Sequence, residues 1–338
     1  MHEALLLWYD NHRRVLPWRA GPGQAPNPYH VYLSEVMLQQ TTVATVKNYF
    51  LRFIAQWPTI HDLAEATLDD VLLNWQGLGY YSRAKNLKNT IDIMAQENHF
   101  PRTYQALLKY PGIGDYTAKA IAAICFDEPV IPIDGNVIRV FSRYFALHTP
   151  LPNLKKDILE HTHTLGAGER PGDFAQAIMD LGSMVCTPKN PQCHICPISH
   201  GCKSVGTATL PPFREPKTRR PTRFGYVYLV QDDGQILIEK RPQNGLLANL
   251  WGFPTSPWQD IDPDSVSQHT QDTPHIKHVF THFTLYLAIR HIQIQPYEAF
   301  IKGDQQKFID PCDLNHYAFP TLMQKVFQHI GAQRLQTT

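Results

Sequence analysis

The chain has 338 residues, 43% of them apolar, and a formal net charge of only +1 at neutral pH. This length predicts two globular domains, and the near-neutral charge excludes a protein that is basic over its whole surface. No apolar run reaches the roughly 18 residues of a membrane helix, and the N-terminus contains Glu3 and no small-residue cleavage site, so we expect a cytoplasmic protein without a membrane partner.

From the N-terminus to about residue 200, apolar residues at helical spacing alternate with Gly and Pro. Asn27-Pro28 is a cap followed by a first-turn proline, which predicts the start of one long amphipathic helix. Glu35 lies within this helix between apolar neighbours. It is either on the solvated face or buried with a raised pKa, as in proton donors that work near neutral pH. The apolar positions of the predicted helix are Val31, Val36, Met37, Val43, Val46, Phe50, Phe53 and Ile54.

Residues 103–126, TYQALLKYPGIGDYTAKAIAAICF, predict a helix, a glycine-containing hairpin and a second helix. Backbone N–H groups of Gly112 and Gly114 would point outward there and offer an anion site for a DNA phosphate. The alternative is an ordinary helix connection. In the next segment, PVIPIDGNVIRV, Asp134 precedes Gly135 and Asn136, a position typical of a helix N-cap.

Four of the six cysteines fall within one short segment, whereas Cys125 and Cys312 stand alone. Disulfides are improbable in a reducing compartment, so the cluster indicates a metal site. Zinc sites usually contain two close Cys pairs, whereas uneven spacing with one close pair favours an iron-sulfur cluster. The clustered cysteines are Cys186, Cys193, Cys196 and Cys202.

A proline-rich segment, residues 206–222, reads as a linker, and the basic run from Arg214 to Arg223 overlaps it. Beyond it, FGYVYLVQ, QILIEKR and VFTHFTLYLAIRHIQI predict strands, with Asp233-Gly234 as a hairpin turn. The fold class is therefore a mainly α N-terminal domain over 1–205 and an α+β C-terminal domain over 223–338.

Five motifs in this order, SEVMLQQT, GLGYYSRAKN, YPGIGDYTA, IDGN and the four cysteines, resemble the endonuclease III superfamily of helix-hairpin-helix DNA glycosylases over residues 1–205. Bifunctional members carry a lysine where this chain has Tyr116, and that lysine attacks the sugar as a nucleophile. Lys119, one helical turn further on, is not expected to replace it. Tyr116 with EVMLQQT and GLGYYSR is similar to the MutY branch, which removes adenine mispaired with 8-oxoguanine.

The resemblance implies a role for each site residue. Glu35 would be the general acid at adenine N7, and Asp134 would stabilise the positive charge that develops on the sugar. Tyr116 and Asn136 would position Asp134 or the sugar. Gln40 would wedge into the duplex and Tyr80 would stack beside the 8-oxoguanine, although a surface amide and a core aromatic are the plain alternatives.

The resemblance also implies a 4Fe-4S cluster on the four cysteines, which fastens a loop whose Lys189 and Lys203 reach phosphate. The C-terminal domain resembles a Nudix-like fold without the glutamate-rich metal box, so pyrophosphohydrolase activity is not expected. In the MutY branch this domain reads 8-oxoguanine through a Phe-Ser-His loop, which corresponds here to Phe280, Thr281 and His282. Without this resemblance, the sequence would predict ordinary sheet residues at Phe280, His278 and His282.

We therefore expect a monofunctional base-excision-repair glycosylase that hydrolyses the N-glycosidic bond of adenine. Its partner would be double-stranded DNA with A:8-oxoguanine or A:G mispairs, and we expect a monomer at the bacterial nucleoid. Two alternatives are a bifunctional glycosylase and lyase for oxidised pyrimidines, opposed by Tyr116 and the Nudix-like domain, and a catalytically idle lesion-binding protein, opposed by Glu35 and Asp134.

Overall fold

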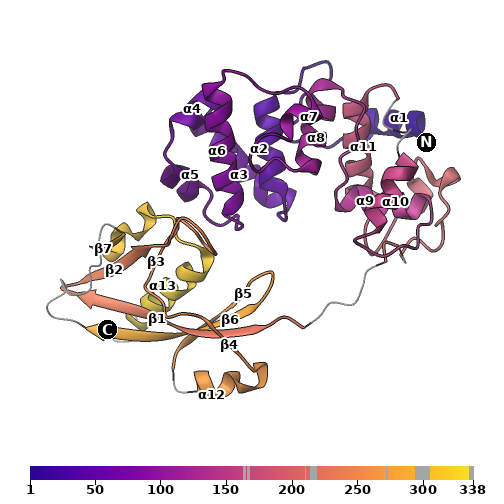
Figure 1. Cartoon of the computed structure of the whole chain (residues 1–338). Helices are drawn as coiled ribbons and strands as arrows, with labels where there is room; N and C mark the ends of the chain where they lie inside the picture. The colour runs from indigo at the N-terminus through magenta and orange to yellow at the C-terminus, as the bar shows by residue number, and fades with distance from the viewer. Residues whose placement is uncertain are drawn as a thin grey trace. The chain divides into compact units, whose positions relative to one another are not determined.

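The structure, a computed structural model, describes residues 1–162, 165, 168–209, 211–213, 219–271, 273–293 and 305–334 (Figure 1). The chain divides into two compact units, Met1–Glu65 with Asn86–Pro216, and Ala66–Lys85 with Lys217–Thr338. Residues 214–218 of the predicted linker, and with them much of its basic run, lie outside the described residues. The domain boundaries 1–205, 206–222 and 223–338 stay a prediction. None of the described helices is both long and apolar enough to cross a membrane.

The first unit is helical, as the sequence predicted. Its helices are α1 (His2–His12), α2 (Pro28–Leu38), α3 (Val43–Gln56), α4 (Ile60–Glu65), most of α6 (Ser82–Gln96), α7 (Tyr104–Leu107), α8 (Asp115–Phe126), α9 (Gly135–Tyr144), α10 (Leu154–Thr162) and α11 (Pro171–Met184). Two 3-10 turns, Cys193–Ile195 and Ser199–Gly201, lie in the cysteine segment.

The single long helix predicted after Asn27 is wrong, because the structure has two helices there, α2 and α3. The Asn27 side chain caps α2 as predicted, accepting hydrogen bonds from the backbone of Tyr29 and His30. The break occurs where Gln40 adopts the left-handed region, with φ of 56°. Thr42 then caps α3 through its side chain. The apolar spacing continues across the break, so periodicity alone could not reveal it.

The helix-hairpin-helix prediction is confirmed by α7, a turn and α8. Gly112 has φ of 77°, a region that favours glycine, and a Cβ there would lie 2.4 Å from the Cβ of Asn86. Gly114 is the N-cap of α8. The turn therefore requires glycine at residue 112, both for its backbone conformation and for the space beside it.

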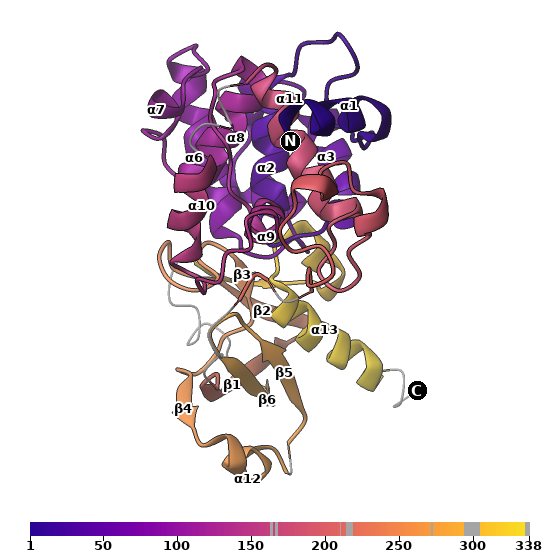
Figure 2. The ribbon, with the colours of Figure 1, turned by 90° about the vertical axis from the view of Figure 1, so that its right-hand side faces the viewer.

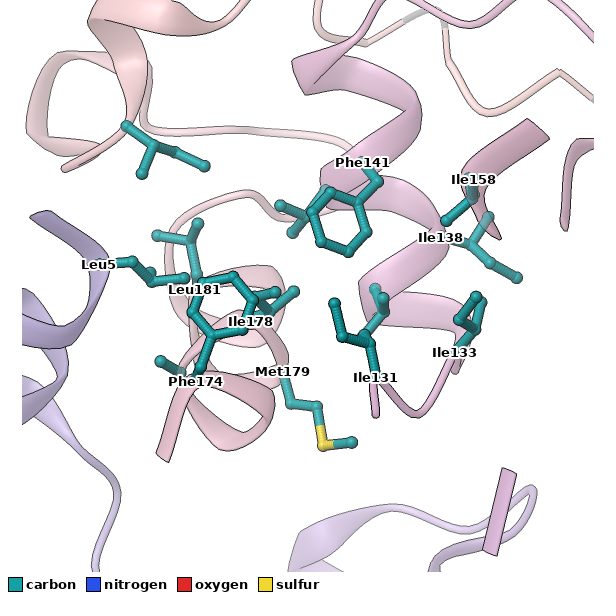
Figure 3. Packing of buried hydrophobic residues seen from close by; sticks show 14 of the residues in the cluster. Leu5, Ile131, Ile133, Ile138, Phe141, Ile158, Phe174, Ile178, Met179 and Leu181 are labelled. Carbon is teal, nitrogen blue, oxygen red and sulfur yellow. The ribbon is translucent and has the colours of Figure 1, made fainter. Parts of the chain in front are cut away.

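A core of buried apolar side chains joins α1, α9 and α11 (Figure 3). Leu5 of α1, Phe141 of α9 and Phe174 and Leu181 of α11 are fully buried within it. Burying one such side chain contributes about 1.5–3 kcal/mol to folding stability, so the shared core stabilises the packing of these helices. The core thus fixes α11 against α9, whose first residue follows Asp134.

The second unit contains one mixed sheet with helices α5 (Leu68–Asn74), α12 (Val266–Thr270) and α13 (Thr321–Arg334). Its strands are β1 (Thr222–Asp232), β2 (Gln235–Lys240), β3 (Trp251–Gly252), β4 (Gln259–Ile261), β5 (His275–Val279), β6 (Thr284–Gln293) and β7 (Gln306–Ile309). The Asp233-Gly234 turn is confirmed. Asp232 pairs with Gln235, and both turn residues have positive φ, 41° and 81°.

β1 pairs in parallel with β6 over ten residues, and β5 pairs antiparallel with β6, which lies beside it in Figure 2. One face of these strands, including Val227 and Leu287, packs against Leu322 and Met323 of α13. β5 and β6 are joined by the short segment 280–283. This connection carries the residues predicted to read 8-oxoguanine.

Candidate active site

Side chains that are far apart in the sequence line one cavity of about 1100 Å³ in the first unit. Glu35 comes from α2, Tyr116 from α8, and Asp134 and Asn136 from the start of α9. Gln40, at the break between α2 and α3, lines the same cavity. The four predicted catalytic residues therefore lie together, and the predicted wedge residue lines the cavity with them.

Glu35 faces the interior, which answers the question that the sequence left open. The residue is only 6% exposed, and the Tyr116 hydroxyl donates a 2.7 Å hydrogen bond to its Oε2. Burial raises the pKa of Glu35 to about 7, with the charge of Asp134 acting in the same direction and the Tyr116 hydrogen bond and Arg19 opposing it. Burial and the charge of Glu35 hold the pKa of Tyr116 well above its ordinary value, so this hydroxyl keeps its proton and donates it.

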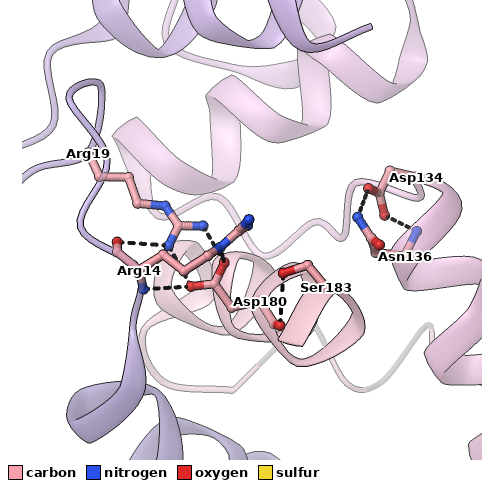
Figure 4. Close-up of polar contacts among 6 residues, drawn as sticks. All are labelled: Arg14, Arg19, Asp134, Asn136, Asp180 and Ser183. Atoms are coloured by element: carbon pink, nitrogen blue, oxygen red, sulfur yellow. Dashed lines mark hydrogen bonds and ion pairs between the residues drawn. The ribbon is translucent and has the colours of Figure 1, made fainter. Parts of the chain in front are cut away.

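Asp134 is the N-cap of α9, as predicted, and its carboxylate is fixed at both oxygens (Figure 4). Oδ1 accepts hydrogen bonds from the backbone N–H groups of Asn136 and Val137, at 2.8 and 2.7 Å. Oδ2 accepts one at 2.9 Å from the Asn136 side-chain amide. Two backbone N–H groups and one side-chain amide therefore fix the orientation of this carboxylate in the cavity.

The orientation of Asn136 is set in turn by Arg139. Its Nη2 donates to Asn136 Oδ1 at 2.7 Å and to the carbonyl of Gly182 at 2.6 Å, while its Nε donates to the carbonyl of Cys186 at 2.7 Å. One guanidinium thus joins the first turn of α9 to the end of α11 and to the cysteine segment. Arg139 was not among the predicted site residues.

A second group that was not predicted is an ion-pair cluster in which Arg14 and Arg19, both partly exposed, contact the buried Asp180 (Figure 4). Asp180 is fully buried, and it accepts from Arg19 Nη1 and Nη2 at 2.6 and 2.9 Å and from Arg14 Nε at 2.6 Å. Burial alone would raise the pKa of Asp180, but these hydrogen bonds and charges outweigh it and hold the pKa below its ordinary value. Arg14 and Arg19 line the same cavity as Glu35.

The four clustered cysteines line one small cavity between α9, α11 and the cysteine segment. Its lining contains no carboxylate and no imidazole, so the donor set consists of thiols and fits a sulfur-ligated iron cluster. Arg143, 2% exposed, donates to Cys186 Sγ at 3.3 Å and to the carbonyl of Thr187 at 2.7 Å. Within the described ranges, no three His, Cys, Asp or Glu side chains are arranged to hold a single metal ion.

The residues predicted to contact the lesion belong to the second unit. Tyr80 is 44% exposed and has φ of 47°, and its hydroxyl lies 2.9 Å from Thr281 Oγ1. Thr281 and His282 are both exposed, whereas Phe280 is half-buried. Tyr80 and Thr281, 201 residues apart, are therefore in direct contact.

Family comparisons match three segments of the chain. Residues 33–163 match the HhH-GPD superfamily of base excision DNA repair proteins, and residues 225–329 match the NUDIX domain. Residues 186–202 match the iron-sulfur binding domain of endonuclease III. The last match confirms the iron-sulfur prediction for the cysteine segment.

Curated relatives align along most of the chain. The adenine DNA glycosylase of Rattus norvegicus is 34% identical over 96% of this chain and 76% of the rat protein. That of Buchnera aphidicola subsp. Schizaphis graminum is 33% identical over 84% of this chain and 85% of its own length. Among solved structures, a thermostable thymine-DNA glycosylase aligns with a TM-score of 0.52 and 26% identity, over 60% of this chain and 93% of that one.

Proposed function

The chain belongs to the adenine DNA glycosylases, base-excision-repair enzymes that hydrolyse an N-glycosyl bond, and on this premise we propose that it removes adenine opposite 8-oxoguanine or guanine as a monofunctional enzyme. The observation that carries the proposal is a buried acid, Glu35, with a pKa of about 7, in one cavity with a second carboxylate. Two carboxyl groups in such different surroundings can divide the work of acid and charge stabiliser.

Adenine leaves readily only after a ring nitrogen has been protonated. Glu35 supplies that proton at N7, since its raised pKa keeps a large fraction protonated near neutral pH. After the base has left, the Glu35 carboxylate takes a proton from the attacking water. The Tyr116 hydroxyl holds Oε2 through both steps.

As the glycosidic bond breaks, positive charge develops on C1′ and the ring oxygen of the sugar. Asp134, held by two backbone N–H groups and the Asn136 amide, stabilises this charge without having to reorganise. Removal of either carboxylate is expected to slow excision at least about a hundred-fold, the usual contribution of one acid-base or electrostatic group.

The proposed monofunctional character is supported by Tyr116, which stands where bifunctional relatives have a nucleophilic lysine. Lys119 is engaged in an ion pair with Asp115, at 3.0 Å, and is not among the residues that line the cavity. The amine that does line the cavity is Lys155, an exposed residue of α10. Borohydride trapping with Lys155→Ala as a control tests whether any lysine forms a Schiff base with the DNA.

Contacts to DNA are assigned by resemblance together with these positions. Gln40 fills the gap left by the flipped adenine. Tyr80 and Thr281 contact the opposite base, and Phe280 and His282 flank Thr281 in the chain. The N–H groups of Gly112 and Gly114 bind phosphate. Phosphate contacts position the protein, whereas Tyr80 and Thr281 carry the specificity.

The iron-sulfur cluster would be held by four cysteine thiolates, those of Cys186, Cys193, Cys196 and Cys202. Through these ligands it would cross-link the segment 186–202, and it would take no part in the chemistry at the base. Lys189 and Lys203, both exposed at this segment, would then contact the DNA backbone. We propose a monomer with a glycosylase domain over 1–205 and a lesion-reading domain over 223–338.

The first test uses duplexes with adenine opposite 8-oxoguanine, guanine or thymine, each analysed with and without alkali. Strand cleavage that requires alkali and is strongest opposite 8-oxoguanine is the expected result. Cleavage without alkali would contradict the monofunctional assignment, and equal rates opposite all three bases would contradict the lesion preference. Glu35→Gln is expected to abolish excision while leaving binding to the duplex.

The role of Thr281 is tested with two variants. Thr281→Ala removes the hydroxyl and should reduce the preference for 8-oxoguanine over guanine, whereas Thr281→Ser keeps the hydroxyl and should preserve it. Both variants should excise adenine opposite guanine at nearly the wild-type rate. If Thr281→Ala keeps the full preference, the hairpin does not read the lesion through this hydroxyl.

A further inference from the structure

Trp258, in the loop between β3 and β4, lies against the hairpin that carries Thr281. Its ring centroid is 6.0 Å from that of Phe280, with the planes 29° apart, and 6.2 Å from that of Phe283. Phe280 and Phe283 are 4.7 Å apart at 31° to each other. Three aromatic rings from two separate segments therefore pack together beside the exposed Thr281 and His282.

The hairpin itself is a minimal turn. Val279 pairs with Thr284, the Phe280 N–H donates to the Phe283 carbonyl at 2.9 Å, and only Thr281 and His282 lie between the two phenylalanines. Neither turn residue has a positive φ, so the turn is not of the type I′ that two-residue hairpins favour. We therefore infer that the turn is stabilised by packing of the flanking phenylalanines against Trp258, and not by the backbone preferences of its own two residues.

Trp258 is held through its ring rather than through its polar atom. Its buried Nε1 has no hydrogen-bond acceptor among the described residues, and the Arg241 guanidinium lies 5.4 Å from the ring centroid. Against β1, a Cβ at Gly225 would lie 2.8 Å from Trp258 Cδ1, so the strand carries glycine where the indole approaches it. The indole is thus confined by β1, by Arg241 and by the phenylalanines of the hairpin.

We propose that Trp258 is a positioning residue for recognition of the base opposite adenine, acting through Phe280 to orient the Thr281 hydroxyl. This inference extends the proposed function, since it takes Thr281 as the group that reads 8-oxoguanine. Trp258 packs against Phe280, the residue directly before Thr281, and the Thr281 hydroxyl lies 2.9 Å from the Tyr80 hydroxyl, so loss of the indole removes a support of the turn next to this contact. Recognition by a single hydroxyl depends steeply on such geometry.

The experiment compares Trp258→Leu, which keeps apolar bulk but removes the ring, with Trp258→Phe, which keeps a ring for stacking. Tyr317→Leu is the matched control, because Tyr317 is also half-buried in the second unit but packs against Trp251 and Lys307 instead of the hairpin. The readout is the ratio of single-turnover excision rates opposite 8-oxoguanine and opposite guanine, measured alongside thermal unfolding of the full chain.

Trp258→Leu should lower this ratio about two- to tenfold, as expected for loss of aromatic stacking beyond buried area, with the rate opposite guanine unchanged. Trp258→Phe should restore most of the ratio, and Tyr317→Leu should leave it at the wild-type value even if it lowers thermal stability equally. An unchanged ratio in Trp258→Leu, or an equal fall of both rates, overturns the inference. If Trp258→Leu does not fold, the ratio of excision rates is measured instead with Arg241→Gln, which removes the guanidinium beside the indole. A wild-type ratio in Arg241→Gln would overturn the inference.

Thr281→Ala distinguishes failure of this inference from failure of the proposed function. If Thr281→Ala lowers the ratio and Trp258→Leu does not, the hairpin reads the lesion but Trp258 does not position it. If neither variant changes the ratio, recognition of 8-oxoguanine by this hairpin is itself wrong.

Discussion

The distinctive feature of the cavity is that its two carboxyl groups, Glu35 and Asp134, have opposite surroundings. Glu35 is buried and receives one hydrogen bond from a neutral hydroxyl. Asp134 receives three hydrogen bonds, two of them from backbone N–H groups at a helix N-terminus. Burial raises the pKa of Glu35, whereas the N-cap position fixes the orientation of Asp134, so the local structure of each residue suits the separate role proposed for it.

Burial of Glu35 has a consequence for stability that can be measured apart from activity. A folded-state pKa of about 7, above the ordinary value of 4.5, means that the stability Glu35 provides is fully present below about pH 4.5 and is lost as pH rises through 7. Glu35→Gln cannot ionise and can still accept from Tyr116. Its stability relative to wild type should therefore rise by about 2 kcal/mol from about pH 5.5 to about pH 8.

This pH dependence is measured as the difference in unfolding temperature between Glu35→Gln and wild type at several pH values. Glu3→Gln, which removes an exposed acid of α1, serves as the control. A constant difference for Glu35→Gln across the range would mean that Glu35 ionises normally in the folded protein.

Asp180 provides a second residue-scale prediction. Asp180→Asn leaves Arg14 and Arg19 without their buried counter-charge, and breaking a buried pair in this way costs about 3–5 kcal/mol. Asp173→Asn, which removes a partly exposed partner of Arg170, should cost only about 0–1 kcal/mol. Denaturant midpoints of the two variants test this contrast. Similar midpoints would show that the Asp180 ion pairs contribute no more to folding stability than the exposed ion pair does.

At the scale of elements, the two glycines of the helix-hairpin-helix turn should differ sharply. Gly112→Ala places a methyl group 2.4 Å from the Asn86 Cβ at a backbone φ of 77°, and such a change costs at least about 1 kcal/mol. A Cβ at Gly114 meets no atom within 4 Å, and its φ of −87° suits any residue. Thermal unfolding should therefore separate the variants, and an equal shift for Gly114→Ala would contradict this account of the turn.

Elements whose signals are local were predictable from the sequence. The Asp233-Gly234 turn, the glycine hairpin before α8 and the Asn27 cap each depend on the conformational preference of one or two residues. The break between α2 and α3 was not predictable, because it depends on Gln40 adopting a left-handed conformation that the fold imposes. Asp180 lies in an apolar run, as Glu35 does, but its arginine partners are more than 160 residues away.

The sequence also identified four cavity side chains as catalytic candidates, but only through a family resemblance. They are those of Glu35, Tyr116, Asp134 and Asn136. Periodicity could not decide whether Glu35 faces solvent or the interior, since α2 is apolar around most of its circumference. Arg139 was missed for a different reason. Its role appears only when the end of α11 and the cysteine segment lie beside α9, which is tertiary information.

A net charge of +1 on the full chain gives no general attraction to DNA, so affinity must come from a few local contacts. The segment 186–202 and the residues after it offer two exposed lysines, Lys189 and Lys203, beside the cluster cysteines. Arg143 fastens the same segment from within, through the carbonyls of Thr187 and Pro188. A rigid loop with exposed lysines is suited to binding phosphates at fixed positions.

If Lys189 and Lys203 each contact one phosphate, replacing either by alanine removes about one released counterion and reduces the slope of log K against log salt by about 1. The effect should be the same for duplexes with and without the mispair, since phosphate contacts carry no sequence information. Binding titrations at several salt concentrations measure it, with Lys47→Ala, an exposed lysine of α3, as the control. Because the whole chain is nearly neutral, replacing both lysines in one double variant should remove a large share of the salt dependence of DNA binding. An unchanged slope in this double variant would show that other residues make the phosphate contacts.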